Sequence, residues 1–113
     1  MDVQTRNLSN EDWEPWLGEG YKDAYSTMMI QKTSASAVST RIIKLNPGGH
    51  TETHSHERLH HVIALEGDPM LETDTENIVL VRLTLVMIDS GIPHRFINKG
   101  KTPAIILVIN LFQ

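Results

Sequence analysis

The feature that most constrains the fold of this chain is a series of short apolar runs separated by turns that contain glycine and proline. Residues 46–49 (Asn-Pro-Gly-Gly) and 66–69 (Glu-Gly-Asp-Pro) are strong turn signals, and no convincing amphipathic helix interrupts the pattern. The runs predicted to form strands are residues 25–31, 37–45, 59–65, 78–88, 94–98 and 103–112. Many short strands joined by such turns favour an all-β fold, either a barrel or a sandwich.

Two of these runs indicate how the strands are covered. In the 78–88 run every odd position is apolar, whereas the even positions include Arg82 and Thr84. The 103–112 run is apolar on both faces, as expected for a strand that is covered on two sides. In a chain of only 113 residues a second subunit could provide that cover, so we expect a homodimer.

The length of the chain predicts one domain. We expect residues 1–20 to form an N-terminal polar segment that packs on the barrel or on a partner subunit, and residues 21–113 to form the barrel itself. Pro15, Gly18 and Gly20 argue against a long helix in the first segment. Trp13 and Trp16 are expected to pack on the body of the fold, with a place at a pocket mouth as the alternative.

Charge and composition exclude several classes of function. Ten basic and fourteen acidic side chains give a net charge of -4 without a basic block, so neither nucleic acid nor a membrane is an expected partner. The absence of cysteine excludes disulfides, thiolate metal sites and a cysteine nucleophile. The N-terminus lacks the basic-then-apolar order of a signal peptide, and we expect a cytoplasmic protein.

Four histidines predict a metal site. Imidazole is the commonest protein ligand for transition metals, and residues two apart on a strand point to the same side. His54 and His56 can therefore hold one ion between them, and His60 has the same parity, whereas His61 would face the other way. One histidine alone would more often be a surface or core residue, but the clustering of the set favours ligation. The predicted ligands are His54, His56, His60 and His94.

A rival interpretation concerns residues 56–60 (His-Glu-Arg-Leu-His), which formally match the His-Glu-x-x-His motif of zinc proteases. In such a protein Glu57 would be the general base, and the motif would lie on a helix. Here it lies between a turn signal and a strand-like run, and no third ligand follows at the required spacing. The protease interpretation is therefore disfavoured. A second alternative, in which His61 replaces His60 as a ligand, stays open.

The spacing of the histidines along the sequence, relative to two glycines, also forms a pattern. Gly48 is followed by five residues and then by His54-x-His56; three residues then lead to His60 and six more to Gly67. This spacing resembles the first motif of the cupin superfamily, in which a glutamate usually stands at the position of His60.

The second cupin motif is matched in part. Gly91, His94 and Asn98 are in register with it, while Leu83 and Asp89 stand where the motif has glycine and proline. The stretch that the two motifs span, from Gly48 to Asn98, covers about half of the chain. Similarity to cupins implies a small jelly-roll β-barrel with a metal ion inside the barrel mouth.

Four neutral ligands, as in the less common four-histidine cupins, would leave the full charge on a divalent ion. Such an ion is a stronger Lewis acid and holds anionic, chelating molecules more tightly. An octahedral ion would keep two positions open, whereas tetrahedral zinc would keep none and would be structural. One divalent transition-metal ion is expected, and Mn, Fe, Co, Ni, Cu and Zn all suit the ligands.

The resemblance implies an enzyme that acts on a small organic molecule, with a dioxygenase-type oxidoreductase favoured. The alternatives are a non-catalytic metabolite sensor, a Lewis-acid isomerase or cyclase, and a structural metal domain, because fold alone does not determine function. We expect Asn98 to stabilise the barrel locally and His50 to be a surface residue or a hydrogen-bond donor behind the site. Further candidates are Glu52, which could orient a ligand imidazole, and three arginines that could anchor an anionic substrate if they face the cavity: Arg41, Arg82 and Arg95.

Overall fold

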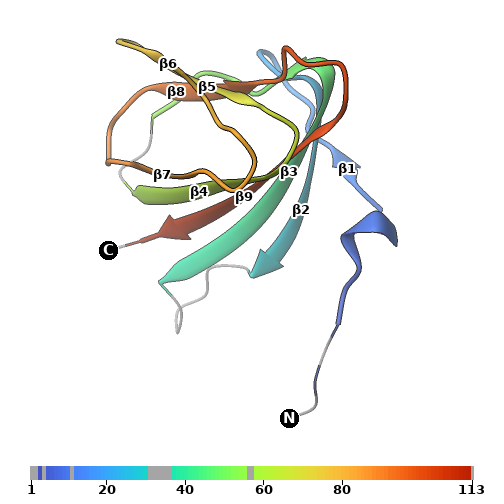
Figure 1. Cartoon of the computed structure of the whole chain (residues 1–113). Coiled ribbons are helices and arrows are strands. Elements are labelled where there is room, and N and C mark those ends of the chain that lie inside the picture. Colours follow the sequence, from blue (N-terminus) through green and yellow to red (C-terminus); the bar gives the residue numbers. More distant parts are fainter. Residues whose placement is uncertain (1–2, 4, 11, 31–36, 56–57, 113) are drawn as a thin grey trace.

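The computed structural model describes residues 3, 5–10, 12–30, 37–55 and 58–112. It contains nine strands: β1 (Glu14–Pro15), β2 (Lys22–Ile30), β3 (Val38–His50), β4 (Leu59–Glu66), β5 (Met70–Thr73), β6 (Asn77–Val79), β7 (Leu85–Ile88), β8 (His94–Ile97) and β9 (Ala104–Leu111) (Figure 1). Across the described residues, helix is limited to the single turn η1 (Leu8–Asn10), and no helix there could span a membrane. The predicted all-β class is confirmed.

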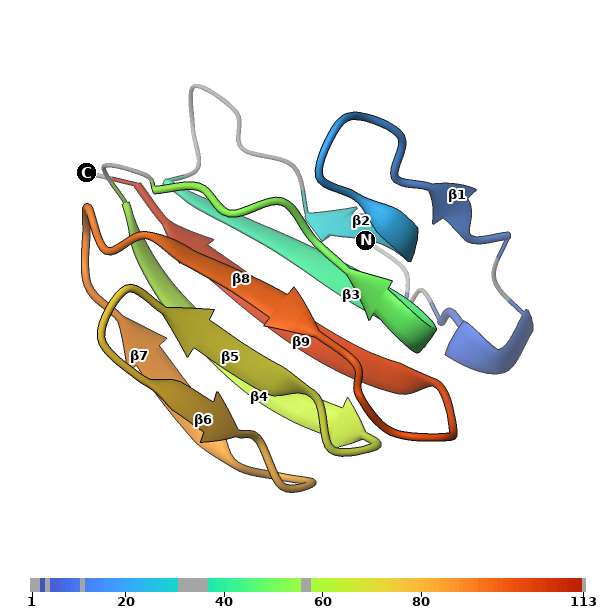
Figure 2. The ribbon, with the colours of Figure 1, turned by 90° about the horizontal axis from the view of Figure 1, so that it is seen from above.

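The strands form one antiparallel sheet in the order β6-β5-β8-β3-β9-β4-β7, and β2 joins β3 outside this path. Most neighbours are far apart in sequence, as in a jelly roll. The sheet curls so strongly that β5, β6 and β8 lie over β4, β7 and β9 (Figures 1 and 2). The predicted jelly-roll β-barrel is therefore confirmed, and the inner face of the curled sheet encloses the core.

The turn signal at residues 46–49 lies within the 13-residue strand β3. β3 pairs with β9 from Val38 to Leu45 and meets β8 at His50, so the strand passes from one half of the barrel to the other. Gly49 is needed at this bend, because a Cβ there would lie only 2.6 Å from the carbonyl oxygen of Asp23.

Burial alternates along β4 and β9, as expected for strands with one face on the core. The inner positions of these strands are buried and the outer positions are partly exposed. The largest fully buried apolar side chains are Ile42, Leu45, Val62, Leu71, Leu80 and Ile106. Since β4 carries His60 on the same inner face as Val62, the alternation that builds the core also turns this histidine inward.

The 78–88 run is two strands instead of the single predicted one. β6 ends at Val79 and β7 begins at Leu85. A turn separates them, in which the amide of Thr84 donates to the carbonyl of Val81 at 2.8 Å. Leu83 is the third residue of this turn and has a positive φ of 70°, which glycine normally provides. Because this position holds a leucine and not a glycine, the sequence pattern did not predict the turn.

The N-terminal segment lies beside β2. Glu14 and Pro15 pair with Ser26 and Tyr25, and the amide of Trp16 donates to the carbonyl of Ala24 at 2.8 Å. The ring of Trp16 stacks on that of Tyr21 with centroids 4.7 Å apart. Trp16 packs against the core and also lines the cavity of the barrel. Both positions expected for the tryptophans, on the body of the fold and at a pocket mouth, therefore apply to Trp16.

Candidate functional site

The barrel contains a cavity of about 390 Å³, bounded by the inner faces of β2, β3, β4, β8 and β9. Its apolar wall consists of Trp16, Met28, Ile43, Val62, Phe96, Val108 and Phe112, and its polar wall of Ser39, Arg41, His54, Arg58, His60, His94 and Asn110. Mainly apolar surroundings with a few convergent polar groups, at this volume, are typical of a small-molecule site.

His60 is held by the strand register. It lies directly opposite Asn110 in the β4–β9 pairing, so the two side chains share the inner face. The Nδ1–H of His60 donates to Oδ1 of Asn110 at 2.6 Å, and Nδ2 of Asn110 donates to Oγ of Ser39 at 3.1 Å. The ring of His60 is thus fixed by a chain of hydrogen bonds that crosses three strands.

His54 and His94 are brought together by the main chain. Each amide donates to the carbonyl of the other residue, at 3.1 and 3.0 Å. The Nδ1–H of His94 donates to the carbonyl of Ile92 at 2.8 Å, and the ring of His54 bonds to the main-chain carbonyl of Glu52. The ring centroid of His94 lies 5.1 Å from that of His54 and 5.1 Å from that of His60.

This donor set suits a metal ion. The oxygen acceptors behind His60 and His94 require a proton on Nδ1, which puts the lone pair on Nε2. Metal-bound histidines show the same arrangement. Two imidazoles on one ion, with bonds of about 2.0–2.1 Å, have ring centroids about 4.5–5.5 Å apart, and both measured pairs fall in that range.

As positioned, however, no three His, Cys, Asp or Glu side chains among the described residues converge closely enough to hold an ion. The fourth predicted ligand, His56, and Glu57 lie outside the described residues. The ring-centroid distances from His94 to His54 and to His60, and the tautomers of His60 and His94, are those expected of metal ligands. The described residues do not, however, form a complete set of ligands around one point. Metal ligation by the four histidines therefore stays a prediction.

Burial lowers the pKa values of the three histidines, which favours their neutral form. It lowers the pKa of His60 to about 4, with smaller lowering contributions from His94 and Arg58. Burial also lowers the pKa of His54, together with the charge of neighbouring His94, and it is the main cause of the lowered pKa of His94. A neutral imidazole is the form that binds metals.

Two arginines make the cavity electropositive. Arg41 lies over the ring of Trp16 at 4.7 Å, and Arg58 lies over the ring of Phe112 at 5.1 Å. Burial and the charge of Arg41 lower the pKa of Arg58. Nε of Arg58 is buried without a hydrogen-bond partner among the described residues, and none of the described lining residues is acidic. Such a cavity favours an anionic molecule.

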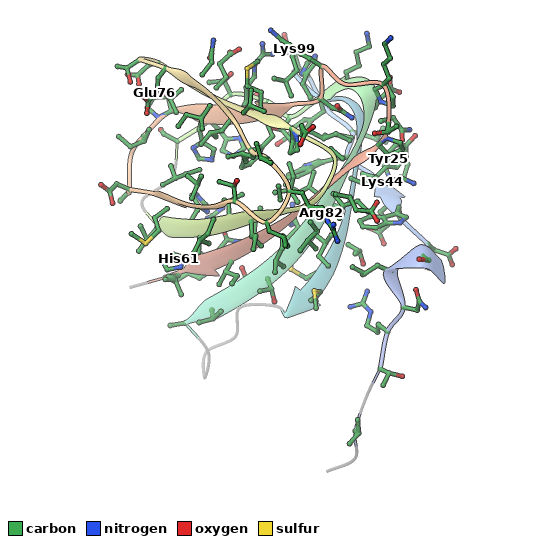
Figure 3. The ribbon with its side chains drawn as sticks, viewed as in Figure 1. Tyr25, Lys44, His61, Glu76, Arg82 and Lys99 are labelled. Atoms are coloured by element: carbon green, nitrogen blue, oxygen red, sulfur yellow. The ribbon has the colours of Figure 1, made fainter. Side chains whose placement is uncertain are left out.

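The other candidate residues lie elsewhere. His61 is on the outer side of β4, as its parity predicts (Figure 3). His50 does not line the cavity, and its Nδ1 lies 3.3 Å from the carbonyl of Thr51. Glu52, which could orient a ligand imidazole, does so through its main-chain carbonyl, which bonds to the ring of His54. Arg95 forms an ion pair with Glu72 at 2.9 Å.

Asn98 and Arg82 also lie outside the cavity. Asn98 is buried, and its Nδ2 donates to the carbonyls of Leu45 and Thr102 at 2.9 and 2.8 Å. It therefore joins two parts of the barrel, as predicted, and does not reach the cavity. Arg82 is exposed and does not line the cavity either, so Arg41 is the one member of the three candidate arginines that does.

Three residues that line the cavity were not predicted from the sequence: Arg58, Asn110 and Ser39. Arg58 stands between His56 and His60, so its proximity to the site could have been inferred from the sequence. Asn110 is 50 residues from His60, and Ser39 is 71 residues from Asn110. Asn110 is a polar residue within the otherwise apolar 103–112 run, and this was the feature of the sequence that could have marked it as a site residue.

Comparison with known families and structures agrees with this architecture. The profile of the family described as "Cupin domain" matches residues 41–110, more than half of the chain. No curated protein sequence matches. A structure described as a predicted oxalate decarboxylase from Thermotoga maritima superposes with a TM-score of 0.86 at 18% identity, covering 97% of this chain and 100% of the other.

Two further structures are similar. The polyketide cyclase RemF from Streptomyces resistomycificus has a TM-score of 0.84 at 19% identity and covers 99% of this chain and 81% of its own. The cupin domain of Cnp3 from Schizosaccharomyces pombe has a TM-score of 0.82 at 8% identity, with coverage of 99% and 76%. At these identities the similarity demonstrates the shared fold alone.

Proposed function

This chain belongs to the cupin family, and on that premise we propose that it is a metal-dependent enzyme acting on a small anionic organic molecule, with a dioxygenase-type reaction favoured. The observation that carries the proposal is one cavity that combines three neutral imidazoles with two guanidinium groups. The imidazoles suit a divalent transition-metal ion and the guanidinium groups suit an anion.

The proposed metal ligands are His54, His60 and His94, with His56 as the fourth. When bound, a divalent ion would supply Lewis acidity and, in the case of Mn, Fe, Ni or Cu, redox chemistry with dioxygen. Asn110 and the carbonyl of Ile92 are the groups that hold the rings in the required tautomer. Their contribution is to orient the ligands before any ion arrives.

The substrate class follows from the remaining wall. Arg41 and Arg58 present planar donors that match a carboxylate or enolate, and the apolar side chains of the same cavity suit a hydrocarbon body. The cavity volume of about 390 Å³ limits the molecule to one of modest size. We infer a substrate with an anionic, oxygen-rich head and an apolar remainder.

The favoured reaction class rests on the composition of the wall. No described lining residue is a carboxylate, and the three imidazoles are assigned to the metal, so no described side chain is left as a strong general base. Oxygenation at a metal centre does not require one. The second candidate is Lewis-acid cyclisation, isomerisation or decarboxylation. Two fold relatives, a polyketide cyclase and a predicted oxalate decarboxylase, suggest the first and the last of these.

The first test is elemental analysis of the purified protein by plasma mass spectrometry, next to His60→Ala and the matched control His61→Ala. We expect about one equivalent of a transition metal in the wild type and in the control, and a large loss in His60→Ala. Failure of the wild type to bind any metal, even after reconstitution, would reject the proposal.

Oxygen consumption then separates the reaction classes. A protein that holds Fe, Mn, Ni or Cu should consume dioxygen when supplied with small aromatic or aliphatic carboxylates and enols. Turnover without oxygen uptake would support the Lewis-acid alternative. Carboxylate binding without any turnover would identify a metabolite sensor and would overturn the assignment as an enzyme.

A further inference from the structure

Residues 14–21 lead into β2 and supply Trp16 to the wall of the cavity. On one side of this segment, the amide of Trp16 donates to the carbonyl of Ala24 at 2.8 Å. On the other side, Gly20 lies so close to Glu52 that a Cβ there would be 2.9 Å from the Cγ of Glu52. The segment is therefore tied to the barrel both at Trp16 and a few residues beyond it.

The ring of Trp16 contacts both an aromatic ring and a cation. It stacks on the ring of Tyr21, with centroids 4.7 Å apart and an angle of 21° between the planes. The guanidinium carbon of Arg41 lies over the indole, 4.7 Å from the ring centroid. Tryptophan is the best aromatic partner for a guanidinium group. Since Tyr21 restricts the rotation of the indole, Trp16 presents a fixed surface to Arg41.

The guanidinium group of Arg41 is not held by polar contacts. Arg41 lies opposite Met28 of β2 and Val108 of β9, which both line the cavity, so its side chain leaves the inner face of β3. Within the part of the chain that the structure describes, no hydrogen bond or ion pair fixes this group. Arg95, in contrast, is fixed by two hydrogen bonds to the carboxylate of Glu72.

The two kinds of contact leave an arginine with different capacities. When a guanidinium group is paired with a carboxylate, N–H donors are occupied, whereas a group stacked on a ring keeps its in-plane donors available. The stack also restricts the side chain, which reduces the entropy that is lost when a ligand binds. Arg41 is therefore both oriented and available to an anion.

We propose that Trp16 is a positioning residue for anion binding: its ring holds the guanidinium group of Arg41 in the orientation that the anionic group of the ligand requires. Residues 14–21 are then part of the ligand site and not only a cover on the barrel. This inference rests on the proposed function, because it requires an anion in the cavity. Arg58 offers an internal comparison, since it lies over Phe112 and is independent of Trp16.

The first experiment tests the stack without a ligand. Trp13→Phe leaves Trp16 as the single tryptophan of the chain, so that its fluorescence is recorded alone. In this background Arg41→Gln should change the intensity and the maximum of the emission, because the cation over the indole is removed. Arg95→Gln is the control and should leave the spectrum unchanged. Identical spectra for Arg41→Gln and its parent would overturn the proposal.

The second experiment measures carboxylate binding by calorimetric titration with acetate, benzoate and succinate. Trp16→Leu should weaken the tightest of these by about three- to thirtyfold, as expected for the loss of a cation–π contact, with the metal content unchanged. Trp16→Phe keeps an aromatic face and should retain most of the affinity. The matched control is Trp13→Leu, which should bind like the wild type because Trp13 does not line the cavity.

A double-mutant cycle separates positioning from a general effect on the fold. In an Arg41→Gln background, Trp16→Leu should cause no further loss, because the group that it orients is absent. In an Arg58→Gln background it should cause its full loss. Equal losses in both backgrounds, or wild-type affinity in Trp16→Leu, would overturn this inference and leave the proposed function intact. If none of the three carboxylates bound the wild type, both the proposed anionic substrate and this inference would be rejected.

Discussion

His60 and Asn110 lie opposite each other on β4 and β9, and the Nδ1–H of His60 donates to Oδ1 of Asn110 at 2.6 Å. Because the amide nitrogen of Asn110 is in turn directed to Ser39, its oxygen faces the ring. One asparagine therefore fixes both the orientation and the tautomer of a proposed ligand.

Replacing Asn110 tests the role of this hydrogen bond. We expect Asn110→Leu to weaken metal binding by about 10–100-fold, because the ring of His60 loses its orienting acceptor. Asn110→Asp keeps an acceptor at the same place and should retain binding. Affinity is measured by competition with a chromophoric chelator. Equal affinities for the leucine variant and the wild type would contradict the assignment.

The metal-free protein should lose stability in acid. The pKa of His60 is lowered to about 4 in the folded chain, whereas an unfolded histidine has a pKa of about 6.5. Between these values the unfolded state binds more protons, so the free energy of unfolding falls as the pH decreases from 6.5 towards 4 and is unaffected above that window. The contribution of His60 is about 3 kcal/mol at its largest.

Urea denaturation of chelator-treated protein at several pH values measures this effect. The lowered pKa values of His54 and His94 act in the same direction. His60→Gln should therefore reduce the pH dependence without abolishing it, and outward-facing His61→Gln should leave it unchanged. A stability of the wild type that is constant from pH 7 to pH 4 is the result that this account does not allow.

Replacing Arg58 or Arg41 should weaken the binding of an anionic ligand without affecting the metal content. Arg58→Gln or Arg41→Gln should weaken the binding of a small carboxylate by about 10–100-fold, as expected for a hydrogen bond to a charged group, while leaving the metal content unchanged. Arg95→Gln is the matched control, since Arg95 is engaged by Glu72 and does not line the cavity. Calorimetric titration with a panel of carboxylates measures the difference. Equal losses in all three variants would point to a nonspecific charge effect.

Asn98 should matter for folding alone. It is 1% exposed, donates to the carbonyls of Leu45 and Thr102, and accepts from the amide of Gly100 at 2.9 Å. Asn98→Ala leaves the buried carbonyl of Leu45 and the part-buried groups of Thr102 and Gly100 without their partner, and we expect a loss of about 2–4 kcal/mol in the free energy of unfolding.

The matched control for this change is Asn77→Ala, because Asn77 is exposed on β6; its stability should stay within about 0.5 kcal/mol of the wild type. The metal content of the folded fraction of Asn98→Ala should be normal. Loss of metal from a fully folded Asn98→Ala protein would instead connect this residue with the site.

Local patterns in the sequence located most of the strands and gave the parity of the histidines, but they missed β1 and β5 and merged β6 with β7. Alternation with a period of two follows from the pleat of a single strand, so it correctly assigned His60 and His61 to opposite faces. The cupin-type spacing pointed to the three histidines that share the cavity. The turn at residues 81–84 escaped detection because its left-handed position holds Leu83, a residue that no turn rule selects.

The sequence by itself thus determined the all-β class and the set of histidines, because both depend on neighbours within a few residues. Only the tertiary structure decided which face of each strand is inside, since alternation defines two faces without distinguishing them. It placed Asn110 and Arg58 at the cavity and turned the odd positions of the 78–88 run, all apolar, outward. The physical reason is that these outcomes depend on strand register between segments tens of residues apart, which the burial of the whole sheet selects.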